Sequence, residues 1–81
     1  LRYLLEIERA SALSEAGRFD AALAELAQAE AREPRRHEAP FAAAAVLHAA
    51  GRVREAEQAA GRAVELAPAG ARAELEQVLR Q

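Results

Sequence analysis

The chain has 81 residues and a formal net charge of −2 at pH 7, and this length accommodates a single domain. Its basic and acidic residues are interspersed, so no basic stripe exists to follow a phosphate backbone, and we expect no nucleic-acid binding. No apolar run approaches the roughly 20 residues that a membrane-spanning helix needs. The absence of cysteine excludes a disulfide framework and thiolate chemistry, and the cellular compartment stays open between cytoplasm and periplasm.

The composition predicts an all-α fold. Alanine, leucine, glutamate, arginine and glutamine dominate the chain, and these residues have the lowest cost in a helix interior. All basic residues are arginine, and together with the abundant alanine this suggests a bacterial genome rich in G and C. Because residue 1 is Leu1 and the chain contains no methionine, we expect it to be a fragment of a longer protein.

The first predicted helix covers residues 3–16, where apolar or small residues such as Leu5 and Leu13 follow helical spacing. Gly17 is expected to end this helix, because glycine adopts the left-handed conformation at little cost. Phe19 is then expected to fold back as an apolar plug in the turn.

A second helix is predicted over residues 21–32. Asp20 is a suitable N-cap for it, since a carboxylate there can accept a hydrogen bond from an unpaired N–H group of the first turn. Pro34 is expected to end the segment, because proline disfavours helical geometry in the residue before it.

The second half of the chain repeats this scheme. One helix is predicted over residues 38–50 and another over residues 54–67, separated by a break at Gly51 and a turn that Val53 plugs. Pro68 ends the second of these.

A shift of 34 residues superimposes residues 3–36 on residues 37–70, and both carry the same turn and end residues. Such a period indicates a repeat architecture. The most informative matched positions are Gly17/Gly51, Arg18/Arg52, Leu13/Leu47 and Pro34/Pro68.

The segments AGRFDAALAELAQAEAREP (16–34) and AGRVREAEQAAGRAVELAP (50–68) resemble the most recognisable stretch of the tetratricopeptide repeat family. Both contain a turn glycine, an apolar residue two positions later, alanines where helices cross, and a final proline. The resemblance implies a right-handed superhelical stack of about five helices in antiparallel pairs. It divides the single domain, residues 1–81, into repeat one (3–36), repeat two (37–70) and a capping helix (71–81, helical over about 71–80).

The first helices fit the family less well. A large aromatic residue is common in the family where this chain has Glu6 and Pro40, and an apolar residue is common where it has Arg9. Either the packing at this edge differs from that of the family, or Glu6 and Arg9 face solvent.

The family resemblance also implies a concave groove, lined by the first helix of each pair, that binds an extended peptide or a partner helix. Its apolar row, Ile7–Phe41–Leu75, is either an exposed partner site or ordinary core, and both interpretations stay open. The residues carried over to this groove are Leu4, Ile7, Ser11, Phe41, Ala45, His48, Arg72, Leu75 and Leu79.

The expected function is therefore binding of a protein or peptide partner. Two alternatives stay open: self-association into a homodimer through the same apolar face, and an appended regulatory domain of a larger protein. We expect no enzymatic activity, because no hydroxyl lies in a nucleophile elbow and no Gly-rich phosphate loop is present. His37 and His48, without cysteine, form no metal-ligand pattern, and no cofactor is expected. The basic segment 32–37 is interpreted as solvated loop charge.

Overall fold

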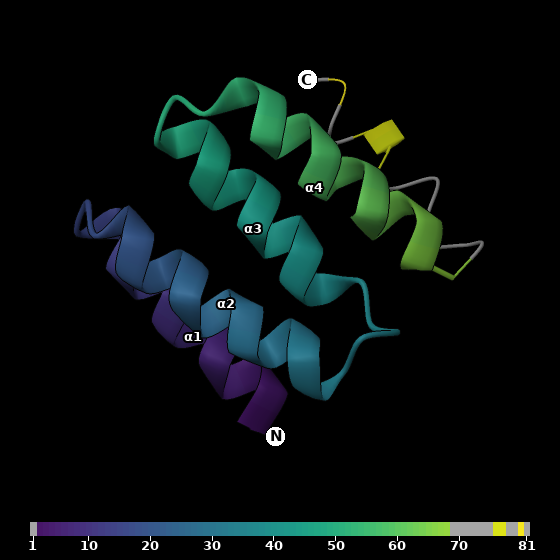
Figure 1. Cartoon of the computed structure of the whole chain (residues 1–81), viewed down its shortest axis with the longest axis horizontal. Coiled ribbons are helices and arrows are strands. Elements are labelled where there is room, and N and C mark those ends of the chain that lie inside the picture. Colours follow the sequence, from purple (N-terminus) through teal and green to yellow (C-terminus); the bar gives the residue numbers. More distant parts are fainter. Residues whose placement is uncertain (1, 69–75, 78–79, 81) are drawn as a thin grey trace.

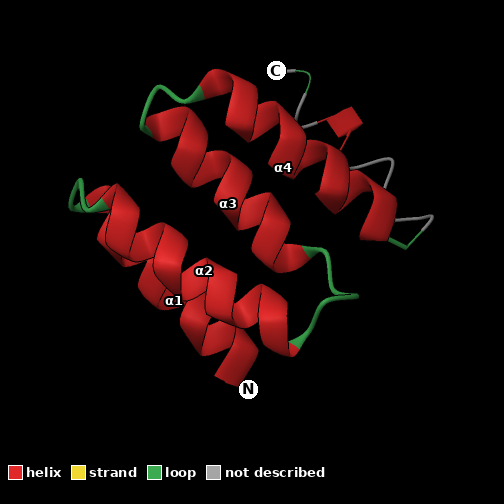
Figure 2. Ribbon diagram, viewed as in Figure 1, coloured by secondary structure: helices red, strands yellow, loops and turns green. Residues whose placement is uncertain are grey.

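The computed structural model describes residues 2–68, 76–77 and 80, and this part of the chain contains four helices and no strand (Figure 2). The all-α prediction is confirmed. Figure 1 shows two antiparallel hairpins, with the first helix of the second hairpin lying between the first hairpin and the last helix. The helices are α1 (Arg2–Glu15), α2 (Phe19–Arg32), α3 (Glu38–Ala49) and α4 (Val53–Leu66).

The predicted helix over 71–80 falls mainly on residues outside the described part. Glu76 and Gln77 are helical, and the N–H of Arg80 donates a hydrogen bond to the carbonyl of Glu76 at 3.1 Å. The count of about five helices is therefore not confirmed, since four are described. The right-handed superhelix of the predicted stack stays a prediction, because two hairpins do not fix its sense.

Gly17 ends α1 as predicted, with a φ of 79°. Its N–H donates to the carbonyl of Ser14 at 2.9 Å, and the N–H of Arg18 donates to the carbonyl of Leu13 at 2.8 Å. These two bonds form a Schellman motif, which satisfies carbonyls that the helix end leaves unpaired.

The turn after α3 repeats this geometry. Gly51 has a φ of 80°, its N–H donates to the carbonyl of His48 at 3.0 Å, and the N–H of Arg52 donates to that of Leu47 at 2.8 Å. The sequence period therefore corresponds to a repeated hydrogen-bonding pattern, and not only to repeated letters.

The predictions for the residues after these turns are corrected in part. Helix α2 begins at Phe19, so Asp20 is its second residue and makes no capping hydrogen bond. An acidic side chain in the first turn still interacts favourably with the helix dipole. Phe19 packs against the core, as the plug prediction requires, but Val53 is 50 % exposed and plugs nothing. The side chain of Val53 is shorter than the ring of Phe19, so it does not fill the equivalent position of the second turn.

The core between the helices is built mainly from alanine, with Leu26 as its largest fully buried apolar side chain. Helix α1 packs against α2 and α3, α2 against α3, and α3 against α4. Small side chains allow the helix backbones to approach closely at these crossings. Fully buried alanines mark each hairpin: Ala10, Ala22 and Ala29 in the first, and Ala39 and Ala63 in the second.

The buried face of α1 differs from the one predicted. Tyr3, Glu6 and Ala10 are buried, whereas Leu5 is 57 % exposed. Spacings of three and four residues place the first three on one side of the helix, and Leu5 lies on the opposite side. The prediction is therefore wrong for Leu5, whereas Leu13 packs against the core as the helical spacing predicts.

Glu6 does not face solvent, and this alternative of the sequence analysis is wrong. Its side chain is 2 % exposed, and both carboxylate oxygens accept hydrogen bonds from the guanidinium of Arg32, at 2.8 and 2.5 Å. A buried carboxylate is tolerated when it is paired and hydrogen-bonded in this bidentate way. Arg9 is exposed, and it pairs with Glu25 of α2 at 3.4 Å.

Tyr3 connects the first hairpin to the start of the second. Its ring is 5 % exposed, its hydroxyl accepts a hydrogen bond from the N–H of Ala39 at 2.7 Å, and the guanidinium of Arg36 lies over the ring at 4.5 Å. Burial raises the pKa of the Tyr3 hydroxyl, although the hydrogen bond from Ala39 acts in the opposite direction. Pro40, at the position equivalent to Glu6, is also fully buried. It lies in the first turn of α3, where proline is tolerated.

Candidate partner-binding face

One side of α1 leaves its side chains in solvent. Leu4 is 46 % exposed, and Glu8, Ser11 and Glu15 are exposed as well. These residues follow one another at spacings of three and four, so they form one stripe along the helix. Ile7 borders this stripe on the side that packs against the core.

Helix α3 presents a second, adjoining surface because it packs against α1. Phe41 is half-buried, and Ala45 and His48 are exposed. We call the surface made by the predicted groove residues of the two helices the α1–α3 face; it comprises Leu4, Ile7 and Ser11 of α1, and Phe41, Ala45 and His48 of α3.

The remaining predicted groove residues, Arg72, Leu75 and Leu79, lie outside the described residues. The apolar row can therefore be followed through its first two members only. Ile7 packs against the buried cluster, and Phe41 keeps part of its ring accessible. Of the two interpretations left open, Ile7 fits the core, whereas Leu4 supplies exposed apolar surface that the row did not include.

The acidic residues of the stripe on α1 were not recognised from the sequence as part of the face. Glu8 and Glu15 have no ion-pair partner within the part of the chain that the structure describes, and both are exposed. Their spacing to Leu4 and Ser11 was the available signal, since residues four apart share a helix face. By contrast, Arg9 extends toward α2, where it meets Glu25.

Two arginines of segment 32–37, which connects the hairpins, form ion pairs with glutamates. Arg32 is bound to Glu6, and Arg36 donates two hydrogen bonds to Glu38, at 3.4 and 2.9 Å. The hydrogen bond from Arg36 holds the pKa of the Glu38 carboxyl below its usual value. The interpretation of segment 32–37 as solvated charge is therefore corrected for Arg32, which is bound to the buried Glu6, whereas Arg36 stays exposed.

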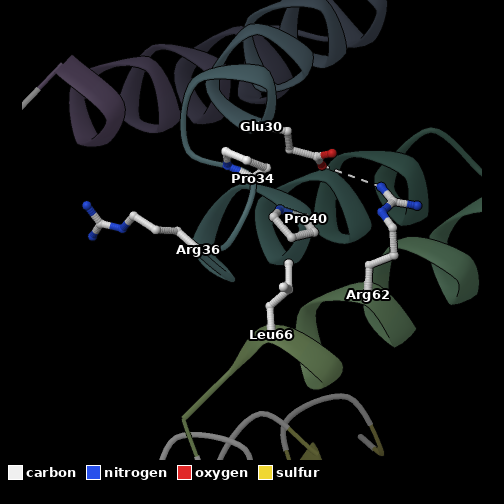
Figure 3. Close-up of a pocket in the computed structure, with 6 residues that line it drawn as sticks. All are labelled: Glu30, Pro34, Arg36, Pro40, Arg62 and Leu66. Carbon is white, nitrogen blue, oxygen red and sulfur yellow. Dashed lines mark hydrogen bonds and ion pairs between the residues drawn. The ribbon is translucent and has the colours of Figure 1, made fainter.

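A pocket of about 110 Å³ opens beside this loop, where the ends of the two hairpins meet (Figure 3). Its charged groups are already occupied, since Arg62 pairs with Glu30 at 3.4 Å and Arg36 points away toward Glu38. It is also smaller than the roughly 300 Å³ at which small-molecule sites begin. We therefore do not assign it a ligand. It is lined by Glu30, Pro34, Arg36, Pro40, Arg62 and Leu66.

In the part of the chain that the structure describes, no group of three or more His, Asp or Glu side chains is placed to hold a metal ion. None of the helices described is both long enough and apolar enough to cross a lipid bilayer.

Protein-family models, curated proteins and solved structures give no match to this chain.

Proposed function

We propose that this chain is a tetratricopeptide-type helical repeat module that binds a protein or peptide segment along the α1–α3 face. The observation that carries the proposal is the 46 % exposure of Leu4 on α1, together with the partial exposure of Phe41 on α3, the helix that packs against α1. Exposed apolar side chains on adjoining helices form a surface that an amphipathic helix or an extended segment can cover.

The repeat assignment has its own support. The two turn glycines are related by the sequence period, have φ values of 79° and 80°, and are followed by the same pair of hydrogen bonds. Two hairpins with the same turn geometry at the sequence period support a helical repeat. The first helices of the two hairpins, α1 and α3, pack against each other.

The proposal is tested by titrating the isotope-labelled chain with an amphipathic helical peptide and following backbone amide shifts by NMR. Leu4→Asp and Ala45→Asp place a charge on each helix of the face at exposed positions, so the fold should persist. Each should weaken binding by about tenfold or more, since it opposes burial of apolar surface.

Val53→Asp is the matched control, because Val53 is as exposed as Leu4 but begins α4. It should leave binding unchanged. Equal loss in all three variants, or shifts confined to α4, would contradict the assignment of the face. Light scattering on the same samples tests the alternative: a dimer that dissociates in Leu4→Asp would instead identify self-association as the function.

A further inference from the structure

We infer that the α1–α3 face selects a cationic amphipathic segment, with apolar side chains on one side and Lys or Arg along its edge, over an anionic one. This inference rests on the proposed function and names the chemical class of its partner. It follows from where the charged side chains of α1 lie, and from which of them are already paired.

The apolar part of the face is bordered by carboxylates. Glu8 lies one turn after Leu4, and Glu15 lies one turn after Ser11, so both follow the exposed stripe of α1. A segment that covers Leu4 must therefore pass beside Glu8. A cation at its edge would meet this carboxylate, whereas a second carboxylate would be repelled.

Two arginines of the first hairpin, Arg9 and Arg32, are paired away from this stripe. Arg9 reaches Glu25 on α2, and Arg32 is committed to Glu6 in the core. The acidic side chain of α3 is Glu38, which is already bound by Arg36. Among the described residues of α1 and α3, Glu8 and Glu15 are thus the carboxylates left for a partner.

The size of the effect follows from the exposure of these groups. Ion pairs at solvent-exposed positions are weak individually and are screened by salt. Attraction of a cationic segment and repulsion of an anionic one act in opposite directions, so their difference is larger than either effect alone. We expect a preference of about tenfold at low ionic strength, falling toward unity at about 0.5 M salt.

The test compares two peptides with the same leucine positions, one with lysine and one with glutamate at every polar position. Fluorescence anisotropy gives the Kd of each for the unaltered chain and for Glu8→Gln/Glu15→Gln. The control variant, Glu33→Gln/Glu57→Gln, changes the net charge equally but at exposed positions outside the face. Circular dichroism verifies that the variants keep their helicity.

The expected result is tighter binding of the lysine peptide to the unaltered chain and the control, with most of this preference lost in Glu8→Gln/Glu15→Gln. An equal loss in both variants would overturn the inference, because bulk charge would then suffice. Equal binding of the two peptides, still weakened by Leu4→Asp, would overturn the inference but leave the proposed function standing. Binding of neither peptide would remove the proposed function and the inference with it.

Discussion

The hydroxyl of Tyr3 accepts a hydrogen bond from the backbone N–H of Ala39, a residue 36 positions further along the chain, at 2.7 Å. Ala39 is the second residue of α3, so its N–H is one of those that a helix N-terminus leaves without an intrahelical partner. A side chain of the first hairpin therefore completes the helix that opens the second. His37, the local N-cap of α3, makes no side-chain capping bond.

Tyr3→Phe should destabilise the chain by about 1–2 kcal/mol, because it leaves the buried N–H of Ala39 without its acceptor. The ring itself is kept, so packing and the contact with Arg36 persist. Urea unfolding followed by circular dichroism measures the difference. A stability equal to that of the unaltered chain would mean that water replaces the hydroxyl as acceptor.

The single tyrosine also gives a pH prediction. Burial raises the pKa of Tyr3 in the folded chain above its ordinary value of 10.0. The unfolded chain therefore loses this proton first, so the stability contribution is complete below about pH 10 and decreases as the pH rises above that value. Tyrosinate absorbance measured beside helicity should show ionisation lagging until unfolding begins. Ionisation in advance of any loss of helicity, with an ordinary midpoint, would contradict it.

The pair of Glu6 and Arg32 should respond unequally to loss of either partner. Arg32→Ala leaves a buried carboxylate without its cation and should cost about 2–3 kcal/mol. Glu6→Leu should cost less than about 1 kcal/mol, because Arg32, with a side chain 38 % exposed, can turn into water. The double variant should match Glu6→Leu alone. Thermal unfolding of the three proteins measures this, and additive losses would show that the two residues are not coupled.

Alanine substitutions at Gly17, Gly51 and Gly61 should affect the free energy of unfolding in two opposite ways. Gly17→Ala and Gly51→Ala should each cost about 1 kcal/mol, because their φ values of 79° and 80° disfavour a side chain. Gly61→Ala should instead stabilise by about 0.5–1 kcal/mol, since Gly61 is inside α4 and an added methyl group meets no atom within 4 Å. Denaturant midpoints for the three variants provide the measurement. Destabilisation by Gly61→Ala would show that α4 is not a regular helix there.

Local signals predicted most of the fold. The four helices lie within two residues of their predicted bounds, because Gly17, Gly51 and Pro34 mark their ends through backbone geometry that depends on neighbouring residues only. The burial of Glu6 could not be predicted from such local signals. Whether a carboxylate can be buried depends on its partner, and Arg32 is 26 residues away, so only the packing of α1 on α2 brings the two together.

The candidate face was predicted in part. Spacing and the family resemblance assigned Leu4, Phe41 and Ala45 to the wall of a concave groove, which stays a prediction, and in the structure all three retain accessible surface. Neither the spacing nor the resemblance could reveal that Tyr3 turns into the core, because this depends on the N–H of Ala39 being unpaired at the start of another helix. The acidic border was visible in the spacing, but its lack of arginine partners depends on where Arg9 and Arg32 are bound.

The alanine-rich core has a calorimetric consequence. Each buried alanine removes only a single methyl group from water, so unfolding exposes less apolar area per residue than in a domain with a core of leucine and phenylalanine. Apolar exposure determines the heat capacity change of unfolding, so this change should fall below its usual value of roughly 12–15 cal/mol/K per residue. The free energy of unfolding then changes slowly with temperature. The domain should therefore keep nearly the same modest stability over a broad range instead of at one sharp optimum.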